Sequence, residues 1–315
     1  MSPKSALQPV SACTRAVTAN IVDNSGKPGV RRVTSRYIPG PGQPGVVEQS
    51  PVVVEDALTL DVEAIGTYTL MWTPTDNVQL MGSGYLSGHG LLSEEVPSAA
   101  LSLAAGFAFT EGLIQNLDDV ESLAVCPDKP GIVRMKLKRP ETVETRRRNL
   151  VMTSSCGICG SREVVENNTF GLNDVPDRMR LMGGGGAELM EEMRQRQAIF
   201  DETGGAHAAA VFTADGRIHA VAEDLGRHNA LDKVIGATLL NGEGFKARGV
   251  LLSSRLSLEM VTKAVRAGLE IVAAVSAPTS LAIAVAERFG VTLCGFVRKG
   301  RLTVYSHPHR IDPLG

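Results

Sequence analysis

The stretch "GVLLSSRLSLEMVTKAVRAGLEIVAAVSAPTSLAIAVAERFGVTLCGFV", residues 249–297, has the clearest pattern in this chain of 315 residues. Short apolar, β-branched runs alternate in it with longer segments of helical pattern, which predicts strands at 249–254, 270–277 and 291–297 and helices at 256–269 and 278–290. Two successive βαβ units of this kind require a parallel sheet covered by helices. We therefore predict an α/β fold with a mostly parallel sheet in the C-terminal part of the chain.

The flanking residues extend this C-terminal α/β domain to 201–315. Two apolar runs surround Asp215-Gly216 in "AHAAAVFTADGRIHAVAED" (206–224), and an Asp-Gly pair in this setting is a strong signal for a β-hairpin. "NALDKVIGATLL" (229–240) has apolar residues at helical spacing, and "RLTVYSH" (301–307) predicts one more strand.

The first two hundred residues divide into three regions by composition. Residues 1–50 are rich in Gly, Pro and Ser and predict an irregular leader. Residues 51–150 predict a smaller N-terminal α+β subdomain, and residues 151–200 a cysteine loop followed by a connecting helix.

Individual elements in these regions follow from their patterns. Strand-like runs begin at Val52, and the glycine-rich segment 76–97 predicts a long loop. The apolar periodicity then predicts a helix over 98–114 that ends near Gly112, strands at 120–125 and 131–137, and a connecting helix over 187–203.

Composition excludes several classes of protein. The chain is 43% hydrophobic and 21% charged with a net charge of −2, so nothing in its charge favours a nucleic-acid or membrane partner. It has no apolar run long enough to span a membrane and no secretory signal. Its five cysteines (13, 126, 156, 159 and 294) are odd in number and scattered, which argues against a disulfide framework and for a cytoplasmic protein.

Polar residues follow three of the predicted C-terminal strands. Ligands of open parallel sheets bind beyond the carboxyl ends of the strands, where helix N-termini present free N–H groups. We therefore predict a binding edge there, whose Ser, Thr and Arg groups suit phosphate oxygens. Its candidate residues are Arg227, His228, Asn229, Asp232, Lys233, Ser253, Arg255, Ser276 and Thr279.

The same residues also allow a purely structural interpretation. Ser253, Ser276 and Thr279 are residues that commonly cap helices, and Arg227 can form an ion pair with Asp224 or Asp232. Neither a GxxxxGK[ST] nor a GxGxxG pattern is present, so the chain lacks the P-loop and dinucleotide fingerprints.

The only CxxC pair of the chain lies in "SSCGICGS" (154–161) and allows four interpretations. A structural zinc site needs four ligands, and neither a second CxxC nor a suitably spaced histidine pair accompanies Cys156 and Cys159, so we expect no metal. A redox pair needs a helix start that lowers the thiol pKa, and structural thiols are normally buried. A sulfur carrier needs a thiolate on a mobile loop, which the flanking glycines favour. The pair by itself leaves all four open.

Several motifs in the same order resemble the FdhD family, the formate dehydrogenase accessory sulfurtransferases. The resemblance extends from about Glu55 to Ile311. It rests on "SSCGICG" (154–160), "TGGAHAAAVF" (203–212), "EDLGRHNALDKVIG" (223–236), "LLSSRLSLEMVTKA" (251–264), "AAVSAPTSLAIAVAE" (273–287) and "LCGFVRKGRLTVYSHPHRI" (293–311).

The resemblance implies a cytoplasmic homodimer with a cytidine-deaminase-like C-terminal domain. Such a protein takes sulfur from a cysteine desulfurase and transfers it to the molybdenum cofactor, bis-molybdopterin guanine dinucleotide, which formate dehydrogenase then receives. It implies Cys156 as the persulfide carrier and Cys159 as its assistant. It also implies cofactor contacts at Phe296, Val297, Arg298, Lys299, Gly300 and Arg301.

One segment departs from the family pattern, and two other functions stay open. The acidic link that the family has after "TP" (73–74) is replaced here by the glycine-rich stretch 75–102. The alternatives are a non-catalytic chaperone that binds the guanine dinucleotide cofactor and a zinc-binding protein. His207 and His228 suit either a chemical or a structural role.

Overall fold

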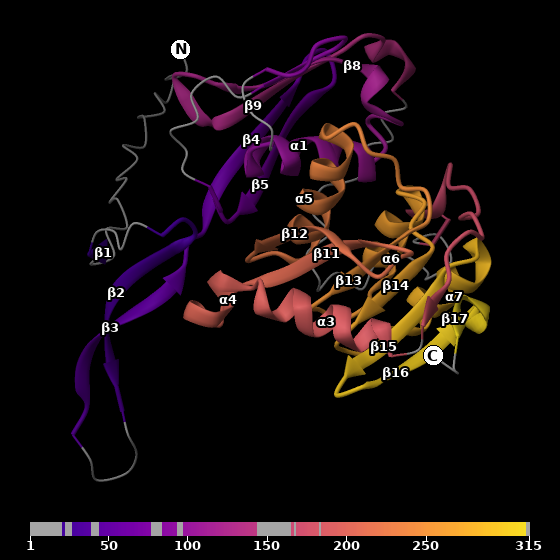
Figure 1. Cartoon of the computed structure of the whole chain (residues 1–315). Helices are drawn as coiled ribbons and strands as arrows, with labels where there is room; N and C mark the ends of the chain where they lie inside the picture. Colours follow the sequence, from indigo (N-terminus) through magenta and orange to yellow (C-terminus); the bar gives the residue numbers. More distant parts are fainter. Residues whose placement is uncertain are drawn as a thin grey trace, which may run out of the picture.

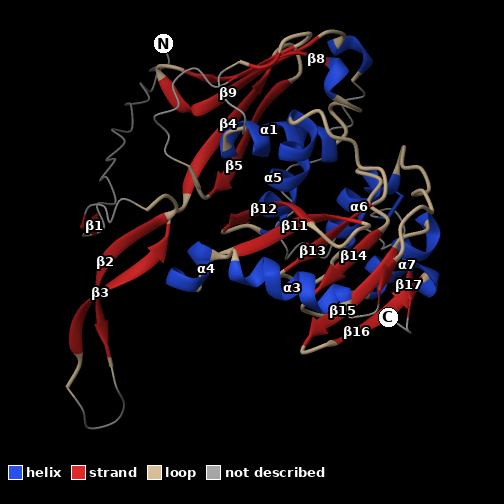
Figure 2. Cartoon of the chain, viewed as in Figure 1, coloured by secondary structure: helices blue, strands red, loops and turns tan. Residues whose placement is uncertain are grey.

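The computed structural model describes residues 21–22, 27–38, 44–76, 84–92, 97–143, 165–166, 168–182 and 184–312. Within them the chain forms two six-stranded sheets with helices between and around them, and a projecting arm whose sheet has three strands (Figures 1 and 2). The structure confirms the predicted α/β class. None of the described helices is long and apolar enough to cross a membrane.

The C-terminal sheet contains both predicted βαβ units. Its strand order is β12-β11-β13-β14-β15-β16. The strands are β11 (His207–Thr213), β12 (Ile218–Asp224), β13 (Arg248–Leu252), β14 (Ile271–Ala274), β15 (Thr292–Arg298) and β16 (Arg301–Ser306). β13, β14 and β15 are parallel and are joined by α6 (Leu258–Arg266) and α7 (Ser280–Phe289).

The prediction of a mostly parallel sheet is wrong, because the sheet is mixed. β11 pairs antiparallel with both β12 and β13, and β15 pairs antiparallel with β16. A tight turn can join only antiparallel strands, so the two hairpins add antiparallel strands on either side of the parallel centre.

Helices cover both faces of the C-terminal sheet. α5 (Arg227–Leu240) packs with α6 and α7 on one face, and α3 (Gly185–Gln195) lies on the other (Figure 1). Side chains of β13 alternate accordingly: Val250 and Leu252 belong to the core on the α5 face, and Leu251 to the core on the α3 face. Burial on both faces explains why the central strands have continuous apolar sequences.

The N-terminal sheet has the strand order β5-β4-β9-β8-β6-β7. Its strands are β4 (Asp56–Val62), β5 (Gly66–Trp72), β6 (Gly84–Leu86), β7 (Gly90–Leu91), β8 (Val120–Cys126) and β9 (Lys129–Leu137). β8 and β9 confirm the two predicted strands, and α1 (Ala99–Thr110) confirms the predicted helix, which stops before Gly112 at a φ of 77°. The predicted loop over 76–97 is wrong in part, because β6 and β7 form a hairpin there that pairs with β8.

α1 joins the two sheets. It packs between the N-terminal sheet and α5, and its residues belong to one continuous core with both. The helices touch backbone to backbone: a Cβ atom on Gly106 would lie 1.8 Å from the Asp232 carbonyl oxygen, and one on Gly236 would lie 1.8 Å from the Ser102 carbonyl oxygen. Only glycine fits at either position.

The prediction of an irregular leader over 1–50 is wrong for its described residues. β2 (Val30–Tyr37) and β3 (Val46–Val53) form an arm that projects from the body (Figure 1), and β1 (Ile21–Val22) pairs with β2. Valines near the ends of both strands favour extended structure. The Gly- and Pro-rich residues 39–43 lie outside the described residues.

The predicted helix over 187–203 is two helices. α3 ends at Gln195, and α4 (Ala198–Thr203) begins after Gln197. The Glu223 carboxylate accepts hydrogen bonds from the N–H groups of Ile199 and Phe200, at 2.9 Å each, and so supports a new helix start. The remaining short elements are β10 (Leu181–Met182), β17 (Ile311–Asp312) and the 3₁₀ turns Leu117–Asp119, Pro140–Thr142 and Pro308–Arg310.

Candidate functional site

The turns after the central strands meet at one edge of the C-terminal sheet. The Phe296 N–H of β15 donates to the Ser276 carbonyl oxygen at 3.2 Å, and the Thr279 N–H donates to the Leu256 carbonyl oxygen at 2.9 Å. These bonds tie the turn after β13, the turn after β14 and the end of β15 together. These three segments therefore form one continuous edge.

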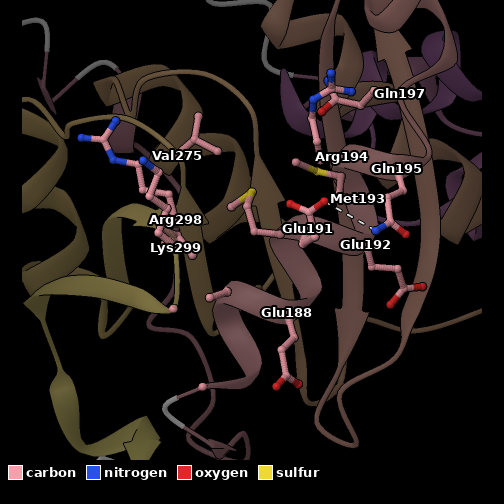
Figure 3. Close-up of a pocket in the computed structure, with 15 residues that line it drawn as sticks. Glu188, Glu191, Glu192, Met193, Arg194, Gln195, Gln197, Val275, Arg298 and Lys299 are labelled. Carbon is pink, nitrogen blue, oxygen red and sulfur yellow. Dashed lines mark hydrogen bonds between the residues drawn. The ribbon is translucent and has the colours of Figure 1, made fainter.

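A groove of about 720 Å³ opens at this edge between α3 and the turn from β15 to β16 (Figure 3). Four of the six residues implied as cofactor contacts line it: Val297, Arg298, Lys299 and Gly300. The wall formed by α3 combines the apolar Met190 and Met193 with the carboxylates of Glu188, Glu191 and Glu192 (Figure 3). The groove is of the size that binds small molecules.

The turn from β15 to β16 has an unusual backbone. Phe296 and Lys299 have φ angles of 53° and 50°, and Gly300 has a φ of 73°. A left-handed conformation costs a non-glycine residue about 1–3 kcal/mol, and such residues concentrate at functional sites. The result is an exposed Phe296 ring with the Arg298 guanidinium 5.9 Å from its centroid, a flat apolar surface beside a cation. Arg301, at the start of β16, is exposed as well.

The small polar residues of the edge have different roles. Thr279 caps α7, because its hydroxyl accepts a hydrogen bond from the Ala282 N–H at 3.3 Å. The Ser253 hydroxyl accepts from the Ala208 N–H at 2.8 Å and therefore joins β13 to β11 instead of capping a helix. Arg255 is exposed, and Ser276 is partly exposed beside it on the edge.

Asp232 and Lys233 are not at the edge, which corrects their sequence-based placement. Asp232 is 1% exposed and its carboxylate lies 2.7 Å from the Lys263 ammonium. The Lys233 ammonium lies 2.7 Å from the Asp224 carboxylate and donates to the Thr73 carbonyl oxygen at 2.7 Å. Both are structural ion pairs, formed with lysines and not, as the structural interpretation supposed, with Arg227.

Asn229 also supports the fold. Its amide donates to the Met71 carbonyl oxygen at 2.6 Å and to the Asp224 carboxylate at 3.0 Å. Lys263 and Thr110, which were not among the candidate residues, complete the buried network around Asp232. A lysine among the apolar residues of the α6 pattern is the one signal that pointed to a buried partner.

Arg227, His228 and Ser253 lie near one another on the α5 face of the edge. Arg227 and His228 are the first two residues of α5, and Ser253 follows β13. His207, at the start of β11, has its Nδ1 atom 3.5 Å from the Ser253 hydroxyl. Burial, followed by the charges of Arg227 and His228, lowers the pKa of His207 below its ordinary value.

Cys156 and Cys159 lie outside the described residues. Among the described cysteines, Cys126 is partly exposed, and Cys294 is fully buried, which raises its pKa to about 12. Cys294 is therefore a poor nucleophile at neutral pH. Within the described part of the chain, no cluster of three or more His, Cys, Asp or Glu side chains is arranged to hold a metal ion.

Together these observations define an α/β protein with a groove at one edge of its mixed C-terminal sheet. Residues 94–312 match the model of the FdhD/NarQ family, and the chain belongs to this family. This confirms the resemblance inferred from the motifs.

Relatives of the chain carry consistent names. The sulfur carrier protein FdhD of Thermoplasma acidophilum is 41% identical over 218 residues, which cover 67% of this chain and 75% of the relative. The sulfur carrier protein FdhD of Streptomyces coelicolor is 37% identical over 273 residues, which cover 85% of this chain and 92% of the relative.

A solved structure has the same fold. The crystal structure of a putative formate dehydrogenase accessory protein from Desulfotalea psychrophila superposes with a TM-score of 0.68 at 22% identity. The match covers 90% of this chain and 100% of that protein.

Proposed function

We propose that this protein is a cytoplasmic sulfur carrier that serves formate dehydrogenase. It accepts sulfur from a cysteine desulfurase as a persulfide on Cys156 and transfers it to bis-molybdopterin guanine dinucleotide, which is its bound substrate. Membership of a family whose curated relatives are named sulfur carrier proteins carries the proposal. The single CxxC pair of the chain supplies the thiols. As the resemblance implies, the protein acts as a homodimer and its C-terminal domain is cytidine-deaminase-like.

The first step loads the carrier. The Cys156 thiolate attacks the terminal sulfur of the donor's cysteine persulfide. The S–S bond of the donor breaks, the donor leaves as a thiolate, and Cys156 keeps the sulfur as a persulfide, so the step involves no net oxidation.

The second step releases the sulfur at the oxidation level of sulfide. The Cys159 thiolate attacks Sγ of Cys156, a Cys156–Cys159 disulfide forms, and the terminal sulfur leaves as hydrosulfide with the electron pair of the broken bond. The hydrosulfide passes to the molybdenum of the bound substrate, and a cellular dithiol then reduces the disulfide. In this step Cys159 is the nucleophile that releases the sulfur from the persulfide of Cys156.

The groove and its cations support the proposed binding of the substrate. Arg298 and Lys299 line the groove and supply charge for a pyrophosphate. The exposed Phe296 ring beside Arg298 suits a planar ring system. Arg301, Arg255 and Ser276 extend the same edge with further donors.

Mass spectrometry of the intact protein tests the proposal. After incubation with a cysteine desulfurase and cysteine, the wild type should gain the mass of one sulfur atom, and reducing agent should remove it. Cys156→Ser should gain nothing, whereas Cys159→Ser should take up sulfur and hold it longer than the wild type, since it lacks the releasing thiol. Equal uptake by Cys156→Ser would contradict the proposal. Guanine nucleotide binding without any sulfur uptake would favour the non-catalytic chaperone.

A further inference from the structure

A group of polar side chains on the α5 face of the sheet edge is separate from the groove beside α3. β11 is antiparallel to β12 and β13, so its first residue, His207, lies where those two strands end. His207 stands beside Ser253 there and is close enough to Arg227 and His228 for their charges to lower its pKa. One strand, one turn and one helix thus place these four side chains together.

The positive charge of this group is only partly balanced by carboxylates. The His228 Nε2 atom lies 3.4 Å from the Glu259 carboxylate, which also accepts a hydrogen bond from the Ser257 hydroxyl at 3.2 Å. The other nearby carboxylate, Asp224, is occupied by the Lys233 ammonium at 2.7 Å. This leaves the guanidinium of Arg227 without a matching carboxylate among the described residues.

One nitrogen atom of the group has no hydrogen-bond acceptor. Within the described part of the chain, Nε of Arg227 is shielded from solvent and makes no hydrogen bond, whereas Nε2 of His228 faces the Glu259 carboxylate at 3.4 Å. Buried polar atoms in native proteins nearly always have a partner, and an exception often marks the place of a ligand or ion. Nε of Arg227 is a donor, so its missing partner is an acceptor.

The start of α5 strengthens the preference for an anion. Its N-cap residue, Gly226, has no side chain to cap the helix, and its first turn contains no acidic residue, whereas the first turn of α6 already contains Glu259. By contrast, α1 and α7 are capped by the hydroxyls of Ser98 and Thr279. Free N–H groups at a helix start carry partial positive charge and bind phosphate readily.

We propose that His207, Arg227, His228 and Ser253 form an oxyanion site that takes a phosphate group, separate from the groove that contains Arg298. All four side chains can donate hydrogen bonds, which matches phosphate oxygens and not a cation or an apolar ligand. The assignment rests on the proposed function in one respect: the natural occupant is then one of the phosphate groups of the dinucleotide substrate. The groove holds another part of the same molecule.

Calorimetric titration of the full chain with inorganic pyrophosphate tests the site. Arg227→Gln should weaken binding at this site by about tenfold or more, because it removes a charge-assisted contact. Arg217→Gln is the matched control: Arg217 is an exposed arginine in the turn at the far end of β11, paired with Asp215, and its loss should leave binding unchanged. In an Arg298→Gln background the remaining binding should still depend on Arg227.

Nuclear magnetic resonance of the histidines adds a second readout. The pKa of His207 should rise when pyrophosphate is added, because a bound anion stabilises the imidazolium. Arg227→Gln should abolish that rise at the same pyrophosphate concentration, and Arg217→Gln should preserve it.

Three results would overturn the proposal. They are no measurable pyrophosphate binding by the wild type, equal binding by Arg227→Gln and the wild type, and complete loss of binding in Arg298→Gln alone. Sulfur uptake on Cys156, measured on the same proteins, keeps the two hypotheses apart. A wild type that binds pyrophosphate through Arg227 but takes up no sulfur would refute the carrier function and leave the phosphate site standing.

Discussion

The first and second turns of α5 each contain a basic side chain, and the surroundings of the two side chains are opposite in kind. In the second turn the Lys233 ammonium is 2% exposed and has three oxygen partners, from Asp224, Thr73 and Glu223. In the first turn, Arg227 is partly exposed, and its Nε atom, which is shielded from solvent, has no partner among the described residues. One helix thus contains a lysine, Lys233, whose charge is paired inside the fold and an arginine, Arg227, whose Nε atom is free to bind a ligand.

This contrast separates residues that hold the fold from residues that are free to bind. A buried charge with a full set of partners cannot turn toward a ligand without losing them, and removing one partner leaves the other charge buried and uncompensated. Substitutions in the interior networks should therefore reduce stability. Substitutions at the edge should alter binding and change stability little.

The largest effect is expected for Lys263→Met. The Lys263 ammonium donates to both carboxylate oxygens of Asp232 and to the Thr110 hydroxyl, at 2.7–2.9 Å. Burial opposes its charge, but the carboxylates of Asp232 and Glu111 hold its pKa above the ordinary value. Removing it leaves the Asp232 carboxylate buried without a cation, which should cost about 3–5 kcal/mol of unfolding free energy. Urea unfolding followed by the fluorescence of Trp72, the only tryptophan of the chain, measures this.

Two variants sharpen that measurement. Adding Asp232→Asn to Lys263→Met should recover part of the loss, because no buried charge then remains. Lys136→Met removes a matched ion pair in which Lys136 and Glu121 are each 46% exposed, and it should cost at most about 1 kcal/mol. Equal losses for the buried and the exposed pair would refute the contrast drawn above.

Gly106→Ala should have the next largest effect. Its new Cβ would lie 1.8 Å from the Asp232 carbonyl oxygen, so α1 and α5 would have to move apart. Overpacking of this kind costs about 1–3 kcal/mol, occasionally more. Gly244→Ala is the control, because a Cβ there meets no atom within 4 Å. A neutral Gly106→Ala in the same urea unfolding assay would show that the helices do not cross at this distance.

The alternating C-terminal pattern predicted the fold well, because each strand and helix there is long enough to show its own period. The prediction for the arm was wrong, because the glycines and prolines between β2 and β3 indicated irregular structure. The two strands are held by pairing between residues as far apart as Val30 and Val53. The prediction of a mostly parallel sheet was wrong in part for a similar reason. The direction of a strand depends on which strands it pairs with, and local periodicity carries no information on pairing.

The candidate site was predictable as a region but not residue by residue. Strand ends located the edge, yet Asp232 and Lys233 looked as accessible as Arg227. α5 lies between its sheet and α1, so residues from Ala230 to Gly236 are all buried and the helix has no polar face in its centre. The partners that neutralise Lys233 include Thr73, 160 residues away. No local pattern could reveal them.

The smallest effect, and the most specific to the edge, concerns the pH dependence of His207→Gln. Burial first, then Arg227 and His228, lower the pKa of His207 in the folded state below its ordinary value. The unfolded chain therefore binds a proton there at a higher pH than the folded chain does, and stability should fall as the pH drops below about 6.5. His207→Gln should flatten this part of a curve of unfolding free energy against pH, measured between about pH 5 and 8. His219→Gln is the control, because it removes a histidine that lies on β12 outside the edge group, with its Nε2 atom 2.6 Å from the Glu243 carboxylate. This variant should leave that part of the curve as it is in the wild type. A curve unchanged by His207→Gln would mean that His207 does not sense the positive charge of the edge, and the contrast between the two turns of α5 would then rest on Arg227 alone.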